Sequence, residues 1–244
     1  MANEHLNRPV AVPADSDLTT HNRGVGVQAG TDLAANKVLK NTYMLLAATL
    51  AFASLTGGVA MALELKFMGF IPFFAIFMGL SFLISATANS AWGLLSIFLF
   101  TGFLGVQVGS AVGIHLGLPN GSAVVTQAFG LTAFVFLGLS AYVVTTKADM
   151  SFLRGFVMVG CMLLLGMCLL YVGMILFGVS LPAPVSLAVS GFIVLLMSAL
   201  ILYQTSEIVH GGETNYILAT TALFVTIYNL LMSLLHIFGV MGDD

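Results

Sequence analysis

The chain has 244 residues, of which 59% are hydrophobic and only 7% are charged, and its mean hydropathy is +1.06. Soluble domains contain roughly 25% charged residues, so this composition excludes an ordinary soluble domain and predicts an integral membrane protein. The formal net charge of -3 excludes a nucleic-acid-binding protein, which would need a basic face.

The first 36 residues differ in composition from the rest of the chain. They are polar, contain Pro and Gly, and lack the apolar core of a signal peptide. Such a segment buries too little apolar surface to offset the entropy of folding. The sequence therefore predicts a disordered tail over residues 1–36 and a helical membrane domain over residues 37–244.

Apolar windows of about 20 residues follow the tail, and this length crosses about 30 Å of hydrocarbon at 1.5 Å per residue. Short breaks with turn-forming residues separate the windows, so successive helices are expected to be antiparallel neighbours. The sequence predicts an all-α membrane protein, a bundle of seven transmembrane helices. The expected spans are Thr42–Leu63, Gly69–Ala88, Ala91–Gly113, Ala123–Val144, Phe152–Val179, Val185–Tyr203 and Ala219–Val240.

Positive residues predict the orientation of the bundle, because cytosolic loops are enriched in Lys and Arg. With a cytosolic tail, only Lys66 is outside, and the C-terminal Asp243-Asp244 is outside as well. The other positive residues are then all inside: Arg8, Arg23, Lys37, Lys40, Lys147 and Arg154.

Glycines recur at intervals of four residues, as a ridge, from the third expected span to just beyond its end. Small residues at this spacing let a second helix approach closely, so we interpret the ridge as a packing surface. Gln107, Ser110 and His115 lie off the ridge and are candidates for an interior cleft. The ridge consists of Gly105, Gly109, Gly113 and Gly117.

The seventh expected span contains a polar stripe. Thr226, Asn229, Ser233 and His236 fall within an arc of about 80° at 100° per residue. Two interpretations stay open, hydrogen bonding between helices and the wall of a water-filled or ion-conducting cavity. Gln204, near the cytosolic end of the sixth helix, is expected to face one end of the stripe.

The string HGGETNYI, residues 210–217, interrupts the apolar chain between the last two spans. Its two glycines predict the end of a helix and a solvated turn. Glu207, His210 and Glu213 recur at intervals of three, which suggests a metal site or a pH-sensitive cluster, but a break at Gly211-Gly212 would separate them. We therefore predict a loop without a metal. The signature residues of this loop are His210, Gly211, Gly212, Glu213, Asn215 and Tyr216.

No motif in the chain predicts catalysis. A nucleophile elbow, a P-loop and the zinc-protease pattern are all missing from the sequence. Cys161 and Cys168 are seven residues apart in one span, about 10 Å along a helix, which is too far for a disulfide. We predict a protein that is not an enzyme and that uses no cofactor.

Several strings resemble the Bax inhibitor-1 family, and within it the bacterial YccA-like branch. They are NKVLKNTYMLL at 36–46, FTGFLG at 100–105, AYVVTTKADMSFLRG at 141–155 and HGGETNYILATTALFVTIYNLLMSLL at 210–235. The resemblance covers nearly everything after residue 36, and the tail shares no distinctive motif.

The resemblance implies a fold in which six helices surround a central seventh, in a bacterial cytoplasmic (inner) membrane, with the C-terminus periplasmic. It also implies a partner, the membrane-anchored protease FtsH together with its membrane partners. Proteins of this branch bind FtsH and modulate it as poor substrates that occupy the protease. A solvated tail suits this role because an ATP-driven unfoldase needs a flexible end to engage.

The alternative function that the resemblance implies is a pH-sensitive leak of calcium or protons. In the family this leak depends on two aspartates, one in each of the last two helices. This chain has Gln204 and Thr226 at the matching positions of LYQTS and LFVTIYN. Calcium favours carboxylate ligands, so a leak by the family's mechanism is not expected, although Glu207, one turn from Gln204, offers a partial replacement of the charge.

Overall fold

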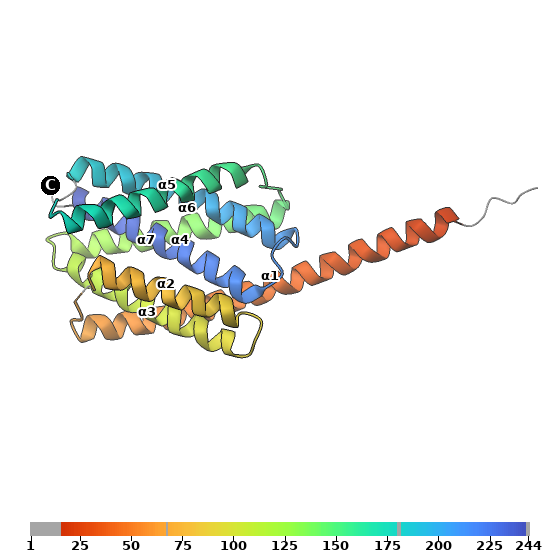
Figure 1. Cartoon of the computed structure of the whole chain (residues 1–244), viewed down its shortest axis with the longest axis horizontal. Coiled ribbons are helices and arrows are strands. Elements are labelled where there is room, and N and C mark those ends of the chain that lie inside the picture. Colours follow the sequence, from red (N-terminus) through yellow and green to blue (C-terminus); the bar gives the residue numbers. More distant parts are fainter. Residues whose placement is uncertain (1–15, 67, 180–181, 243–244) are drawn as a thin grey trace, which may run out of the picture.

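The computed structural model describes residues 16–66, 68–179 and 182–242, without the side chains of residues 16–32. The described residues form α-helices joined by short turns, and no strand occurs among them. Figure 1 shows the helices lying side by side in one bundle, with the start of α1 extending beyond it. The helices are α1 (Ser16–Ala62), α2 (Phe70–Thr87), α3 (Trp92–Leu116), α4 (Gly121–Thr146), α5 (Leu153–Leu176), α6 (Ala183–Val209) and α7 (Tyr216–Met241).

The prediction of seven membrane spans is confirmed. In the described part of the chain, seven helices are long and apolar enough to cross a membrane, and in α1 the span covers Leu33–Ala62. Helix α1 begins at Ser16 and so includes residues 16–36 of the predicted tail. Residues 1–15 lie outside the described residues, and the division into a disordered tail and a membrane domain stays a prediction.

The break between α2 and α3 is only four residues long, because a tight turn connects the two helices. Ser90 N donates to Thr87 O at 2.8 Å. Gly93, in the first turn of α3, packs so closely on α2 that an added Cβ would lie 2.7 Å from Thr87 O. A small residue is therefore required where the chain reverses direction.

The helices differ greatly in how much of their surface other helices cover. The most apolar windows of α3 and α7 are 61% and 56% buried, whereas those of α2 and α5 are each 6% buried. Helix α7 packs against α1, α3, α4 and α6. Its leucines Leu223, Leu230 and Leu235 lie fully inside the core. The last helix thus contributes much of the buried core.

The outer surface of the bundle is made of large apolar side chains. Phe82 of α2, Phe134 of α4 and Leu169 of α5 are each more than 70% exposed. On a soluble protein such a surface would be an aggregation hazard. On seven helices of membrane-crossing length it is the surface that contacts lipid hydrocarbon.

The predicted glycine ridge packs against α1 over only half of its length. An added Cβ on Gly105 would collide with Thr56 Oγ1 and the Ala53 carbonyl, and one on Gly109 would collide with the backbone of Gly57. Gly113 has no neighbouring atom within 4 Å of an added Cβ, and Gly117 is the residue that ends α3. The ridge is therefore a packing surface at Gly105 and Gly109 and not at the other two, because α1 and α3 diverge beyond their crossing point.

Candidate functional site

The HGGETN string ends α6 through backbone geometry that needs a glycine. Gly211 has φ +74°, in the left-handed region. Gly211 N donates to Ile208 O at 3.3 Å and Gly212 N donates to Glu207 O at 2.8 Å. This pair of bonds is the Schellman motif, which satisfies the last carbonyls of a helix. The predicted helix end is confirmed.

Asn215 of the same string begins α7 and ties it to another loop. Its Oδ1 accepts from Ile217 N at 2.9 Å and Leu218 N at 3.3 Å, the geometry of an N-cap. Its Nδ2 donates to Ala88 O at 3.1 Å and to Asn89 Oδ1 at 2.9 Å. One side chain therefore fixes the start of α7 against the turn between α2 and α3.

Ser206, on the last turn of α6, connects the two most distinctive strings of the sequence. Its Oγ accepts from Met150 N at 3.0 Å and lies 3.3 Å from both Ala148 O and His210 Nδ1. His210 Nδ1 also lies 2.9 Å from Ser206 O. TTKADMSF and HGGETNYI thus meet at one end of the bundle, although more than 50 residues separate them. We call this end the loop cluster, defined by Ala148, Met150, Ser206, His210 and Asn215.

Asp149 belongs to the loop between α4 and α5 and points into solvent. Ser151 N donates to its Oδ1 at 2.8 Å. This backbone hydrogen bond, followed by the Ser151 side chain, lowers the pKa of the Asp149 carboxyl below its ordinary 3.8, and the nearby His210 lowers it further. The carboxylate therefore stays ionised at neutral pH and helps to hold the loop in place.

The polar stripe of α7 is divided between two environments. In the half of the helix nearer the loop cluster, Thr226 is buried, and its Oγ1 lies 3.1 Å from Gln204 Oε1 and 2.9 Å from Ala222 O. Gln204 and Thr226 therefore meet across the α6–α7 interface as an uncharged pair. Glu207 is not part of this contact, since its carboxylate lies over Gly212 in the loop.

Other buried hydroxyls make contacts between helices that could not be predicted from the sequence. Thr205 Oγ1 lies 3.4 Å from Tyr43 OH of α1 and 3.3 Å from Ser140 Oγ of α4. Thr220 Oγ1 of α7 donates to Thr42 O of α1 at 3.2 Å. These uncharged contacts join α1, α4, α6 and α7 at the level next to the loop cluster.

The other half of the stripe faces a large cavity. Asn229 and His236 line it, whereas Ser233 is buried and is not among the residues that line it. His236 Nε2 lies 3.2 Å from Ser186 Oγ of α6. The cavity has a volume of about 760 Å³ and lies between α2, α5, α6 and α7. Gln204 and Thr226 do not line it, so the stripe is not one continuous wall.

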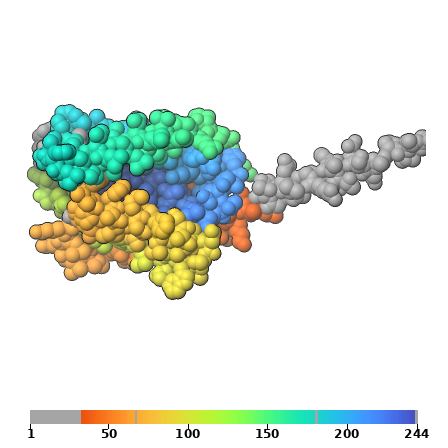
Figure 2. Space-filling model, in the orientation of Figure 1, coloured from red at the N-terminus to blue at the C-terminus, as the bar shows by residue number. Residues whose placement is uncertain are grey.

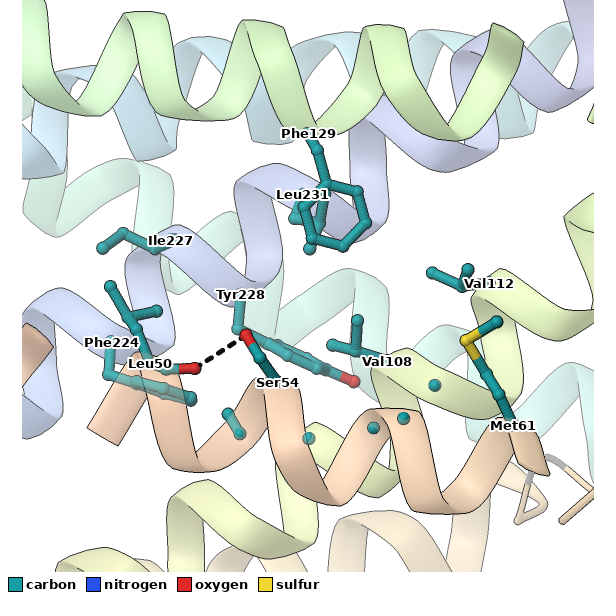
Figure 3. A pocket seen from close by; sticks show the side chains of 15 residues that line it. Leu50, Ser54, Met61, Val108, Val112, Phe129, Phe224, Ile227, Tyr228 and Leu231 are labelled. Atoms are coloured by element: carbon teal, nitrogen blue, oxygen red, sulfur yellow. Dashed lines mark hydrogen bonds between the residues drawn. The ribbon is translucent and has the colours of Figure 1, made fainter. Parts of the chain in front are cut away.

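A second, smaller cavity lies on the other side of α7, between α1, α3 and α4. Its volume is about 280 Å³, and its walls are apolar apart from Ser54 and Tyr228. In Figure 3, Tyr228 reaches from α7 toward Val108 of α3, and the Ser54 hydroxyl donates to Leu50 O. Tyr228 lines both cavities. Gln107, Ser110 and His115 line neither of the two.

Gln107 is nevertheless an unusual residue of the described core. It is 2% exposed near the middle of α3, and its Oε1 has no hydrogen-bond partner among the described residues. An unpaired amide oxygen in a membrane interior is costly. In the sequence, only the position of Gln107 off the glycine ridge, within an apolar span, indicated that this residue is unusual.

The geometry so far defines a class of protein, a seven-helix membrane bundle whose polar contacts lie in loops and between uncharged interior side chains. A family model described as inhibitor of apoptosis-promoting Bax1 matches residues 35–243. The chain belongs to the Bax inhibitor-1 family.

Relatives of known name or source support this assignment. An uncharacterized protein of Pseudomonas aeruginosa is 51% identical over 85% of this chain and 90% of its own length. The modulator of FtsH protease YccA from Escherichia coli K12 is 44% identical over 87% of this chain and 94% of its own length. A second Escherichia coli relative, equally similar, is named inner membrane protein YccA. The chain is a multi-pass protein of the bacterial inner membrane, and the two Escherichia coli relatives are named as a protease modulator and as an inner membrane protein.

Proposed function

We propose that this protein binds an FtsH-type membrane protease directly and inhibits it without performing any chemistry itself. The observation that carries the proposal is the 44% identity, along 87% of the chain, to the modulator of FtsH protease YccA. The similarity extends through the membrane helices, so it includes the part of the chain that a membrane-anchored protease would contact.

Inhibition by occupancy requires a chain that the protease engages and then extracts slowly. Residues 1–36, with a cytosolic N-terminus and a periplasmic C-terminus, would provide the end that the protease engages. The uncharged contacts of α7 with α1 and α6, together with its N-cap, support a central last helix that resists extraction. The inhibitor would thus be a poor substrate because its last helix is held from several sides.

The alternative function, a pH-sensitive calcium or proton leak, has less support. At the two positions where the family's leak uses aspartates, Gln204 and Thr226 bond to each other. Neither side chain titrates near neutral pH, and an amide with a hydroxyl is a poor ligand set for calcium. We therefore do not propose conduction as the function.

The direct test is affinity purification from native membranes after cross-linking, in a bacterium that contains an FtsH-type protease. We expect the protease to be recovered with the full-length chain. We also expect deletion of residues 1–30 to reduce this recovery and to lengthen the lifetime of the chain. Turnover of an independent membrane substrate of the protease should be slowed by the full-length chain.

A matched control replaces residues 1–30 by an unrelated polar segment of equal length. If the tail acts only as a flexible end, this replacement should restore recovery and turnover. If neither the deletion nor the replacement changes recovery or lifetime, the tail is not the point of engagement. If the protease is not recovered with well-expressed full-length protein, direct binding is wrong.

A further inference from the structure

The cavity of about 760 Å³ between α2, α5, α6 and α7 has the size of a small-molecule site, for which 300–1,000 Å³ is typical. It lies in the half of the bundle where α7 ends, since its α7 residues run from Tyr228 to His236. Figure 2 shows blue atoms of α7 between the orange α2 and the teal α5. The cavity therefore opens sideways, toward the lipid, between two helices that are each only 6% buried.

One wall of the cavity is aromatic. Helix α2 contributes four phenylalanines at the spacing of one helix face, and Tyr171 of α5 packs edge-on against the first of them at 4.9 Å between ring centroids. Tyr228 of α7 stacks on Phe73 at 6.4 Å. Such a wall favours a flat ring over a flexible chain, because aromatic rings gain from offset and edge-on contacts. The four residues are Phe70, Phe73, Phe74 and Phe77.

The opposite wall, from α6 and α7, offers hydrogen-bond donors. Asn229 Nδ2 donates to Val225 O at 2.8 Å, which leaves its second proton and Oδ1 without a partner among the described residues. The hydroxyls of Ser190 and Tyr228 have no hydrogen-bond partner in the described part of the chain, although both residues are less than 10% exposed. Unpaired donors in a membrane interior are costly, so a bound group that accepts their protons would be stabilised.

The lining also indicates the charge of the occupant. No Asp, Glu, Lys or Arg is found among the described residues that line the cavity. A charged group placed there would lose its hydration without gaining an ion pair. The occupant must therefore be uncharged in the part that enters the cavity.

We propose that this cavity binds a membrane-soluble quinone, with its planar ring against the α2 phenylalanines, its carbonyl oxygens toward α6 and α7, and its apolar tail leaving between α2 and α5. The ring carbonyl oxygens accept hydrogen bonds from Asn229, Ser190 or Tyr228. The site is a binding site only, and no electron transfer is involved. A quinone reaches it from the bilayer without crossing water.

Cys161 and Cys168 report on this site, because both line the cavity from α5 and neither is in a disulfide. The experiment uses the full-length protein purified in nanodiscs and alkylated with N-ethylmaleimide. The ligand is a decyl-substituted benzoquinone with no free ring position for thiol addition. We expect it to slow alkylation of both cysteines in a saturable manner. Decylbenzene, which has the tail and a ring but no carbonyl oxygen, should give little protection.

Three variants test the assignment. Val189→Phe adds a ring inside the cavity and should abolish protection, whereas Leu169→Phe adds the same ring on the lipid-facing side of α5 and should leave protection unchanged. Asn229→Leu removes one hydrogen bond and should weaken quinone binding by roughly tenfold. If Val189→Phe does not fold, the comparison of Asn229→Leu with Leu169→Phe still tests whether the quinone binds in the cavity.

Two results would overturn the proposal. Equal protection by decylbenzene and the quinone would mean that the cavity takes any apolar chain without recognising a carbonyl. Unchanged alkylation at saturating quinone would mean that the cavity is not a ligand site. A loss of affinity in Asn229→Leu for the quinone alone would support recognition of the ring.

Discussion

The α1–α3 side of the bundle is closed where its glycines meet, with the smaller cavity beside them, whereas the side between α2 and α5 is open. At the closed side, Gly57, Gly105 and Gly109 bring two backbones into contact, so that no Cβ fits between them. At the open side, α2 and α5 meet near Phe70 and Tyr171 and leave a large cavity over α7. Since both sides are apolar, hydrophobicity alone does not decide which helices approach closely. The presence of small residues or of bulky aromatic residues does.

The largest expected effect on the free energy of unfolding is at the closed side, where α1 and α3 touch. Gly109→Ala places a methyl group against the Gly57 backbone, and overpacking of this kind costs about 1–3 kcal/mol. The matched control is Gly113→Ala on the same helix, where nothing lies within 4 Å. This variant should be neutral or stabilising, because Ala is favoured over Gly in helices. Thermal unfolding of both variants in detergent compares them, and equal melting temperatures would contradict the assigned crossing.

A somewhat smaller effect is expected where α7 is tied to the loops. Asn215→Ala removes the N-cap of α7 and the bonds to Ala88 and Asn89, and it should destabilise the protein by about 1–2 kcal/mol. Asn120→Ala is the control, because Asn120 precedes α4 without a side-chain cap bond and its Nδ2 makes a single long hydrogen bond, 3.5 Å to Gly242 O, among the described residues. The free energy of unfolding is measured for both variants. A similar loss of stability in the two would argue against a special role of Asn215.

The hydrogen bond between Thr226 and Gln204 should contribute less to the free energy of unfolding than the α1–α3 contact or the bonds of Asn215. Thr226→Val removes the hydroxyl that faces Gln204 and should cost about 0.5–1.5 kcal/mol, in the range of hydrogen bonds between membrane helices. Thr221→Val is the control, since the Thr221 hydroxyl bonds only to Ile217 O of its own helix. A double-mutant cycle with Gln204→Leu isolates the coupling. A coupling energy of zero would show that the two side chains do not stabilise each other.

The smallest effect is the pH dependence at the loop cluster. The pKa of Asp149 is lowered in the folded state by its hydrogen bond from Ser151 N, so its contribution is present above the unfolded pKa. That contribution is lost as the pH falls below about 4, through the lowered folded pKa. Asp149→Asn should therefore lower the stability slightly at neutral pH, leave it nearly unchanged at low pH, and so flatten the acid side of the stability profile. An identical acid limb in both proteins would contradict this role.

Loops were more predictable from sequence than the interior was. Gly211-Gly212 signals a helix end within one short string, and the structure has this end, with Gly211 in the left-handed region. The contacts of Thr205 with Tyr43 and Ser140 were not predicted, because the partners lie 162 and 65 residues away. A hydroxyl within an apolar span looks the same in sequence whether it bonds to its own helix or to another.

The glycine ridge and the polar stripe were each predicted as single features, and each is divided in the structure. Gly105 and Gly109 contact α1 while Gly113 does not, because two straight helices that cross stay close over only a short length. Thr226 pairs with Gln204 while Asn229 and His236 face the cavity, because α6 covers one part of α7 and the opening between α2 and α5 exposes another.

By itself, the sequence determined the number of spans, the positions of the turns and the family. Hydrocarbon thickness sets the length of an apolar helix, and turn residues act locally. Only the tertiary structure decided where the bundle is closed and where it is hollow. That outcome depends on which side chains from distant helices meet, since lipid favours every apolar face equally and only packing and hydrogen bonds distinguish one helix pair from another.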